Sequence, residues 1–413
     1  MIDFAFYFIL ILEIALLSRL EYLKWGTLVT PFNMLAILFG FVCTLSIVYS
    51  LSYPNVKDFY LPSLIVWIIG LAFFYLPTCL IRVKHRPLQD GIVLGKNNKS
   101  DDFYVILYAV TMFLIMIALI KIRSVGIQST LGTDEFSEDY GGSGGLFAHI
   151  SIFLEMMFAF FLYKLDKRHK LAIIPILLIL LVSLAQASKT HILAPLLMGF
   201  FTRILTGKTK LSAKAAILIT IAAASVFFGI YFISIILSGA TDSYEVYFNF
   251  VTLHFLDYFL GGSLSFSLDY QYDILEPDMT LGLISPFVSV WEKLTGIASK
   301  ATIDNPIFLD MGELGETNVR TFFGTIYAYS NSYVVLILMS LFISSIVYFI
   351  YYLSYTKNNL FLTIAASSNM TYLVFGSFFD FYWIHIYPYE IVVICLILFA
   401  FSSVINGVSR KRS

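Results

Sequence analysis

The sequence predicts an all-α polytopic membrane protein, and three observations support that fold class. Hydrophobic residues make up 59% of the chain and aromatic residues 17%. Charged residues make up only 13%, against about a quarter in ordinary soluble domains. The mean hydropathy is +0.84, and apolar runs recur along the whole chain between short polar stretches. We therefore expect one integral-membrane domain over residues 1–413, with no separate soluble domain.

The apolar runs predict about eleven transmembrane helices, because a bilayer core of about 30 Å needs roughly 17–25 apolar residues per helix. Only Ser188, Lys189 and Thr190 separate the sixth run from the seventh. The two runs therefore form either two separate spans or a single bent helix. The predicted spans lie near residues 3–18, 31–51, 60–81, 103–120, 146–164, 171–188, 190–206, 214–237, 328–353, 360–376 and 389–407.

The positive charges predict the orientation, since lysine and arginine are enriched in cytoplasmic loops. Nineteen of the 26 basic residues fall on one side of the predicted spans, which we assign to the cytoplasm. They are Arg19, Lys24, Arg82, Lys84, Arg86, Lys96, Lys99, Lys164, Lys167, Arg168, Lys170, Arg203, Lys208, Lys210, Lys214, Lys357, Arg410, Lys411 and Arg412. The N-terminus is then outside and the C-terminus cytoplasmic.

A large exterior loop is predicted over residues 238–327, and loops of that size are usually functional. Within it, Glu245–Leu260 is short for a span but forms an amphipathic helix, with His254 and Asp257 on one face. A second helix is expected to begin with Ser285 as its N-cap and Pro286 in its first turn. We expect this loop to lie on the membrane surface as short amphipathic helices.

Several families of soluble enzyme are excluded by missing motifs. The sequence has no GxxxxGK[ST] loop, GxGxxG turn, CxxC pair, HExxH helix or GxSxG elbow. Cys43, Cys79 and Cys395 fall inside predicted spans and are read as packing residues. We therefore predict no metal site, no cofactor and no nucleic-acid partner.

Three cations on the exterior side run against the charge bias. Arg320 and Lys189 each lie at the exterior end of a predicted span, and Arg123 follows the fourth span. Arginine and lysine at a membrane surface suit a phosphate or pyrophosphate ligand. The alternative is that they reach lipid headgroups or pair with nearby acids such as Glu316.

His254 and Asp257 are the candidate pair for proton transfer. They lie three residues apart on one helix face, a spacing at which a carboxylate can orient an imidazole. We predict that His254 accepts a proton with assistance from Asp257. The alternative is a histidine that only satisfies a local hydrogen bond.

Other polar residues fall in apolar or aromatic surroundings. Glu13 and Glu155 lie mid-span, where they either serve a function or pair within the bundle. Asp380, Trp383 and His385 lie in the aromatic run GSFFDFYWIHIYPYE. These rings either stack on sugars or form an aromatic belt at the membrane interface.

Three local motifs and the order of spans carry a family resemblance. The motifs are TPFN (Thr30–Asn33), ASKTHILAPL (Ala187–Leu196) and NVRTFFGTIY (Asn318–Tyr327). With the large exterior loop before the last three spans, they resemble the bacterial O-antigen polymerases of the Wzy type. The resemblance implies a GT-C-like glycosyltransferase architecture in the bacterial cytoplasmic (inner) membrane, with the active site on the periplasmic face.

The resemblance also implies a reaction in lipopolysaccharide or other polysaccharide biosynthesis. The growing glycan would move from undecaprenyl pyrophosphate to a sugar hydroxyl of an incoming lipid-linked repeat unit. Arg320, Lys189 and Arg123 would hold the pyrophosphate, and Arg320 would also act in catalysis by stabilising the negative charge that builds as the sugar–pyrophosphate bond breaks. Membrane lipid and a chain-length regulator would be partners. Two alternatives stay open: an O-antigen ligase that moves finished glycan to another acceptor, and a lipid-linked oligosaccharide flippase.

Overall fold

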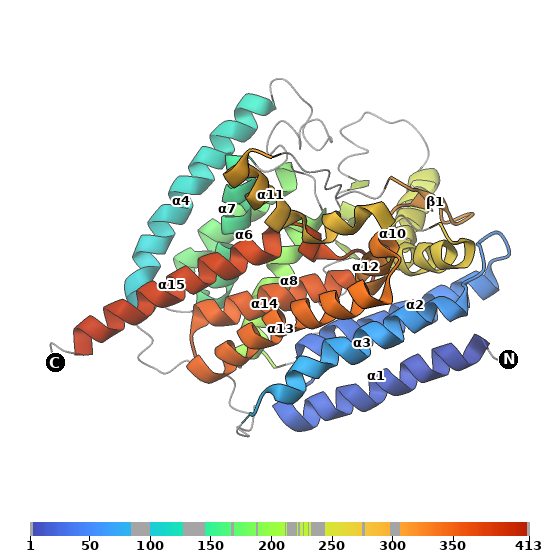
Figure 1. Ribbon diagram of the computed structural model, residues 1–413. Helices are drawn as coiled ribbons and strands as arrows, with labels where there is room; N and C mark the ends of the chain where they lie inside the picture. Colours follow the sequence, from blue (N-terminus) through green and yellow to red (C-terminus); the bar gives the residue numbers. More distant parts are fainter. Residues whose placement is uncertain are drawn as a thin grey trace. The chain divides into compact units, whose positions relative to one another are not determined.

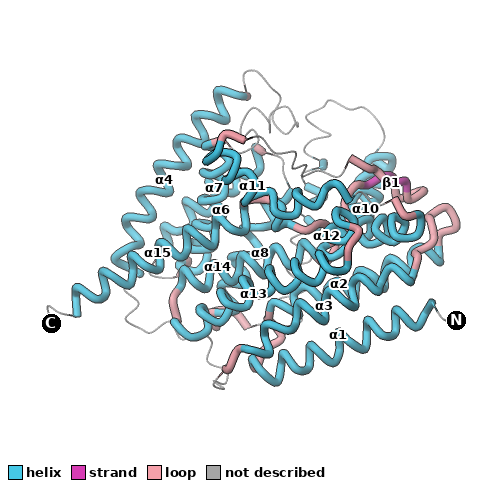
Figure 2. Tube along the Cα trace, in the orientation of Figure 1, coloured by secondary structure: helices cyan, strands magenta, loops and turns pink. Residues whose placement is uncertain are grey.

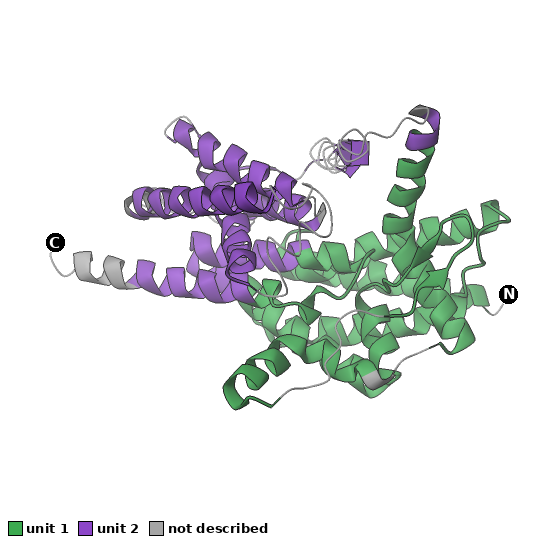
Figure 3. Cartoon of the chain, turned by 90° about the horizontal axis from the view of Figure 1, so that it is seen from above, with its two compact units in different colours: residues 1–88, 248–352, 372–389 green, residues 89–247, 353–371, 390–413 purple. Residues whose placement is uncertain are grey.

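The computed structural model describes residues 3–83, 100–126, 145–166, 169–186, 189–210, 244–274, 277–297 and 306–410, with a few positions between 212 and 232. Nearly all of the regular structure in these ranges is helical (Figure 1; Figure 2). The chain divides into two compact units, coloured separately in Figure 3. Unit 1 comprises residues 1–88, 248–352 and 372–389, and unit 2 comprises residues 89–247, 353–371 and 390–413.

Unit 1 contains the first three long helices and most of the predicted exterior segment. Its elements are α1 (Asp3–Trp25), α2 (Pro31–Ser52), η1 (Leu61–Ser63), α3 (Leu64–Leu80), most of α10 (Tyr244–Tyr272), η4 (Pro277–Ile284), α11 (Ser285–Thr295), β1 (Leu309–Asp310), β2 (Glu316–Thr317), α12 (Phe322–Ser330), most of α13 (Tyr333–Lys357) and η5 (Tyr382–Ile384). In its core, Trp67 of α3 stacks on Phe39 of α2 and meets Phe323 of α12 edge-on at 4.9 Å. Aromatic packing therefore joins α12 to the membrane helices.

Unit 2 is built around α6, which packs against its neighbours in sequence. Its elements are α4 (Ser100–Val125), α6 (Leu146–Lys164), η3 (Lys170–Ala172), α7 (Ile173–Ala185), α8 (Lys189–Leu205), most of α14 (Leu360–Gly376) and most of α15 (Tyr387–Arg410). Buried polar contacts join α6 to the following helices: Gln186 donates to Ser151 at 3.1 Å, and His191 Nδ1 lies 2.5 Å from Glu155 Oε1. The sixth and seventh apolar runs form separate helices, α7 and α8.

Five helices among the described residues are long and apolar enough to cross a membrane, so the chain is a mostly helical membrane protein. They are Pro31–Ser52, Leu61–Leu80, Phe103–Val125, Leu146–Lys164 and Tyr333–Lys357. Shorter apolar helices occupy Lys170–Ala185, Thr190–Leu205, Leu360–Gly376 and Tyr387–Ser403, each at a predicted span. The first predicted span lies within α1, and the span predicted at 214–237 falls mostly outside the described residues.

The second span shows how the sequence specifies a helix start. Thr30 has extended backbone and accepts a hydrogen bond from the amide of Asn33, while Pro31 occupies the first turn. A threonine cap accepts a hydrogen bond from a backbone N–H that has no partner within the first turn of the helix. Proline fits in that turn because its missing N–H would have had no partner there. The motif TPFN is thus the N-terminal cap of α2.

The predicted exterior segment contains a longer helix than expected. The sequence suggested about 16 residues at 245–260, whereas α10 runs for 29 residues. The second expected helix is present as α11, but Ser285 does not cap it, because its hydroxyl donates to the carbonyl of Ile384. A small hairpin, β1–β2, follows and is held to the segment after α2 by the Lys57–Asp310 ion pair at 3.3 Å.

The predicted span 328–353 is broken near its start, which is a correction to the sequence prediction. A separate helix, α12, covers Phe322–Ser330 and has every residue buried. Asn331 then adopts a left-handed backbone with φ 44°, and α13 begins at Tyr333. Asparagine tolerates this conformation better than most residues, so it ends one helix and lets the next begin in a new direction. Interrupted helices in membrane proteins occur where the chain lines a site or is covered by protein.

Candidate functional site

Arg320 is one of the largest fully buried side chains among the described residues, with 1% of its surface exposed. Its guanidinium donates through Nε and Nη2 to the carboxylate of Asp269, which is also 1% exposed. The remaining hydrogen bonds go to the carbonyls of Thr317 (3.1 Å), Val319 (3.0 Å) and Ile307 (3.1 Å). A guanidinium has five N–H donors, and these five contacts use all of them.

This geometry changes the role expected of Arg320. The sequence suggested a cation facing a pyrophosphate, but the guanidinium is buried and fully engaged by Asp269 and three carbonyls. In the structure Arg320 fixes the segment between the hairpin and α12 through these carbonyl contacts. Burial raises the pKa of the Asp269 carboxyl to about 6, and the guanidinium beside it limits the rise.

Thr321, the next residue, holds a strained backbone at the start of α12. Its φ of 66° and ψ of 174° belong to a region that is essentially restricted to glycine. Its amide donates to the carbonyl of Phe379 at 2.9 Å, and its hydroxyl accepts from the indole of Trp67 at 3.2 Å. Such strain persists only where the surroundings enforce it, and it concentrates at functional sites.

The predicted proton-transfer pair lies on α10, with both residues partly buried. The His254 ring stacks on Phe250 at 4.6 Å, and the Asp257 carboxylate lies against Gly261, where an added Cβ would come within 2.7 Å of it. Tyr258, on the same helix, stacks on Phe379 at 5.4 Å. One face of α10 therefore meets the loop that follows α14. The predicted pairing of His254 with Asp257 stays a prediction.

That loop contains the residues predicted to contact a glycan. The Asp380 carboxylate accepts hydrogen bonds from the Thr325 hydroxyl on α12 (2.5 Å) and from the amide of Phe381 (2.6 Å). The His385 ring lies 6.1 Å from Tyr382 and stacks on Tyr387 at 5.5 Å. Both side chains are partly buried.

Trp383 is not available to a glycan in this structure, contrary to the expectation from sequence. It is 1% exposed, and its ring packs on Phe322 at 5.6 Å and Phe381 at 6.1 Å. A ring enclosed by other aromatic side chains has no face left for a sugar. Trp383 is a core residue beneath the loop.

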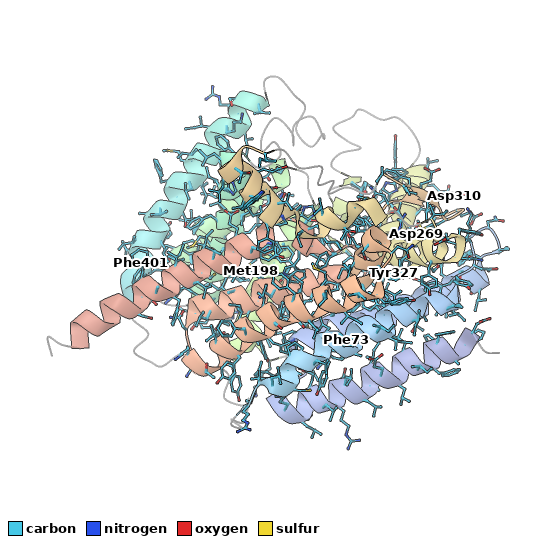
Figure 4. All side chains as sticks on the ribbon, viewed as in Figure 1. Phe73, Met198, Asp269, Asp310, Tyr327 and Phe401 are labelled. Atoms are coloured by element: carbon cyan, nitrogen blue, oxygen red, sulfur yellow. The ribbon has the colours of Figure 1, made fainter. Side chains whose placement is uncertain are left out.

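Unit 1 thus brings together most of the predicted site residues. The ion pair joins Arg320 to α10, Thr321 joins α12 to Phe379, and Asp380 joins the loop back to α12. Figure 4 labels Asp269 and Tyr327, which lie near one another where α10 meets α12. Sequence reasoning missed Asp269 and Thr321. A carboxylate in the otherwise uncharged stretch SLSFSLDY was the available signal for the first.

The other two predicted cations, Lys189 and Arg123, belong to unit 2. Lys189 is the first residue of α8, and the position of its side chain lies outside the described part of the structure. Arg123 is exposed in the last turn of α4, at the edge of an apolar groove of about 320 Å³.

The two mid-span acids behave differently. Glu155 is buried and pairs with His191 of α8, so it belongs to a polar contact within the unit 2 bundle. Glu13 is partly buried, and its Oε2 has no hydrogen-bond partner among the described residues. Among those residues, no group of three or more His, Cys, Asp or Glu side chains is placed to hold a metal ion.

Comparisons with known proteins identify a family without an assigned activity. A model for the "Family of unknown function (DUF6337)" matches residues 55–406, so the chain belongs to that family. No curated protein matches the chain, and no solved structure does. The matched range includes the ion pair, α12, the α10 face and the loop after α14.

Proposed function

We propose that this member of the DUF6337 family is a membrane glycosyltransferase that polymerises lipid-linked oligosaccharide repeat units. It transfers the growing glycan from undecaprenyl pyrophosphate to a sugar hydroxyl of an incoming repeat unit. The observation that carries the proposal is the grouping in unit 1 of the His254 face of α10, the Asp380 loop and the strained start of α12. The fold supports it too, since a polyprenyl tail stays in the bilayer in which the helices lie.

The proposed reaction needs little from the protein because its leaving group is already activated. The acceptor hydroxyl oxygen attacks the anomeric carbon, and the bond from that carbon to the pyrophosphate oxygen breaks. Its electron pair leaves with undecaprenyl pyrophosphate, and the hydroxyl proton passes to His254, oriented by Asp257. The protein must align two lipid-anchored substrates and accept one proton.

The buried ion pair gives Arg320 a positioning role in this proposal. It fixes the backbone that leads into α12 and so places Thr325 beside Asp380. Pyrophosphate binding by Lys189 and Arg123, the other cations predicted for it, stays a prediction. Asp380 and His385 are proposed to hydrogen-bond the glycan, whose hydroxyl groups need both donors and acceptors.

The proposed topology completes this account. The four shorter apolar helices and the runs at 3–18 and 214–237 also cross the membrane, giving eleven spans in a GT-C-like arrangement. The N-terminus and the segment from α10 to α12 are then periplasmic, and the C-terminus is cytoplasmic in a bacterial inner membrane. A chain-length regulator is a proposed partner.

Glycan length in cells tests the proposal. A strain lacking the gene is complemented with wild type, His254→Gln or His149→Gln at matched membrane levels. His149 is the control because its imidazole pairs with Glu390 in unit 2, at 2.8 Å. We expect wild type and the control to restore a ladder of repeat units, and His254→Gln to leave a single unit on the acceptor. If the empty strain lacks even the single unit, the protein acts in ligation or export, and the proposal is wrong.

A further inference from the structure

Four tyrosines from separate parts of unit 1 converge at the far end of α10 from His254. Tyr60 precedes η1, Tyr270 lies in the last turn of α10, Tyr327 lies on α12 and Tyr333 begins α13. We call these four side chains the tyrosine cluster. Neighbouring ring centroids are 6.3 Å apart for Tyr60 and Tyr270, 5.7 Å for Tyr270 and Tyr327, and 4.8 Å for Tyr327 and Tyr333. Three of the rings are partly exposed, and Tyr327, at 7%, lies beneath them.

Two phenol groups of the cluster are hydrogen-bonded to each other. The Tyr270 and Tyr333 hydroxyl oxygens are 2.9 Å apart, and the Tyr327 ring lies against that of Tyr333. Two phenols bring two hydrogens, and their one contact uses one of them. One donor and several lone pairs are therefore left for a further polar group. Asp273 follows Tyr270 by three residues and is exposed, so it adds a carboxylate at this end of α10.

The arrangement differs from an aromatic belt at a membrane interface. Belt residues lie singly at headgroup level, with each ring facing lipid. Tyr53, just after α2, is closer to that description, since it is 47% exposed and its ring stacks on Tyr49 of the preceding turn at 4.3 Å. The tyrosine cluster instead joins four segments and turns two of its hydroxyl groups, those of Tyr270 and Tyr333, toward one another. Ring faces beside hydroxyl and carboxylate groups are the chemistry that a pyranose needs, since its C–H faces are apolar and its edge is polar.

We propose that the tyrosine cluster is a binding subsite for a pyranose ring of the glycan. Along α10, 16 residues separate Tyr270 from His254, or about 24 Å at 1.5 Å per residue. The subsite therefore holds a sugar distant from the reacting hydroxyl. It takes the glycan-stacking role that the sequence suggested for Trp383, whose ring is enclosed. The inference rests on the proposed function for the identity of the glycan, but sugar binding is measurable without any transfer reaction.

The test is saturation-transfer NMR of the full-length protein in lipid nanodiscs, with methyl pyranosides of common bacterial sugars as probes. The variants are Tyr270→Ala, which removes one ring, and Tyr270→Phe, which keeps the ring and removes the hydroxyl. Tyr53→Ala is the matched control, and size-exclusion chromatography shows that each variant is folded. We expect wild type and Tyr53→Ala to give the same saturation signal with at least one sugar. Tyr270→Ala should bind about tenfold more weakly, and Tyr270→Phe should fall between them.

The outcomes separate the inference from the proposed function. If wild type gives no signal with any probe, or if Tyr53→Ala weakens binding as much as Tyr270→Ala, the subsite assignment is wrong. If Tyr270→Ala does not fold, Tyr270→Phe is compared with Tyr53→Ala instead. The subsite assignment is then wrong if Tyr53→Ala weakens sugar binding as much as Tyr270→Phe does. A sugar signal that depends on Tyr270, from a protein whose loss leaves the cellular ladder unchanged, supports the subsite and overturns the polymerase proposal. A ladder of repeat units that the wild-type gene restores, together with sugar binding that does not depend on Tyr270, supports the polymerase proposal and overturns the subsite.

Discussion

Five hydrogen bonds hold the Arg320 guanidinium, and its removal leaves the Asp269 carboxylate buried without this counter-ion. Breaking one partner of a buried ion pair costs about 3–5 kcal/mol. We therefore expect Arg320→Ala to lower the free energy of unfolding by that amount, measured by thermal or denaturant unfolding in detergent. Arg320→Lys should lose less, since it keeps the charge but supplies three donors instead of five.

The matched control for this prediction is Arg123→Ala. Arg123 is exposed at the end of α4, so its removal should change the free energy of unfolding by less than about 0.5 kcal/mol. Equal stability of the Arg320→Ala and wild-type proteins would contradict the reading of Arg320 as a positioning residue.

The ion pair also predicts a pH dependence. Burial raises the pKa of Asp269 from 3.8 to about 6 in the folded chain, so the folded state binds this proton more tightly than the unfolded state. The stability contributed by this protonation is fully present below about pH 4 and is lost as the pH rises through about 6. Acid conditions near pH 5 therefore do not destabilise the fold through Asp269, but they remove the charge that holds Arg320.

We expect the rate of glycan transfer by the purified protein to fall as the pH drops below about 6. Protonation of Asp269 should not lower the unfolding temperature over the same pH range. An Asp269→Asn protein is neutral at this position at every pH, so it should be weakly active, and its acid limb should be shallower because only the proton acceptor His254 still titrates there. The measurement is initial rate against pH for both proteins. An acid limb of the same shape in Asp269→Asn would assign it to another group.

At the scale of elements, the close approach of α10 to the loop after α14 depends on Gly262. A Cβ added there would lie 2.6 Å from the carbonyl oxygen of Phe378 and 3.0 Å from that of Phe379. Backbone atoms cannot move aside as a flexible side chain can, so Gly262→Ala should cost about 1–3 kcal/mol and reduce activity. Gly229→Ala is the control, because a Cβ at that helical glycine meets nothing within 4 Å. It should be neutral or slightly stabilising. Similar unfolding temperatures for the two variants would argue against the packing described here.

The sequence predicted the helical class, most helix positions and the start of α2, because apolar runs and the Thr30–Pro31 cap are local signals. It did not predict the break at Asn331 or the length of α10. Both depend on burial against other segments, which periodicity alone does not report. Arg320 was identified as unusual, but its pairing was not predicted, because its partner, Asp269, is 51 residues away in sequence. The Tyr270–Tyr333 contact joins residues 63 apart and was missed for the same reason.

At the scale of the whole molecule, the charge bias predicts which side of the membrane each segment faces. Single cysteines at Asp310 and Lys208, in a protein with Cys43, Cys79 and Cys395 replaced by alanine, test it in intact cells. Asp310 is 56% exposed on the hairpin, and Lys208 is 30% exposed after α8. A maleimide that does not cross membranes should label Asp310→Cys without lysis and Lys208→Cys only after lysis. The reverse pattern would invert the proposed topology.

The most direct test of the polymerase proposal is a reconstituted reaction. The purified protein in lipid nanodiscs receives undecaprenyl-pyrophosphate-linked repeat unit as its sole glycan substrate, and the products are separated by length. Because each repeat unit acts as both donor and acceptor, a polymerase gives a ladder of increasing length. We expect that ladder from wild type and its absence from His254→Gln. Unchanged single repeat units after incubation with folded wild-type protein would contradict the proposal.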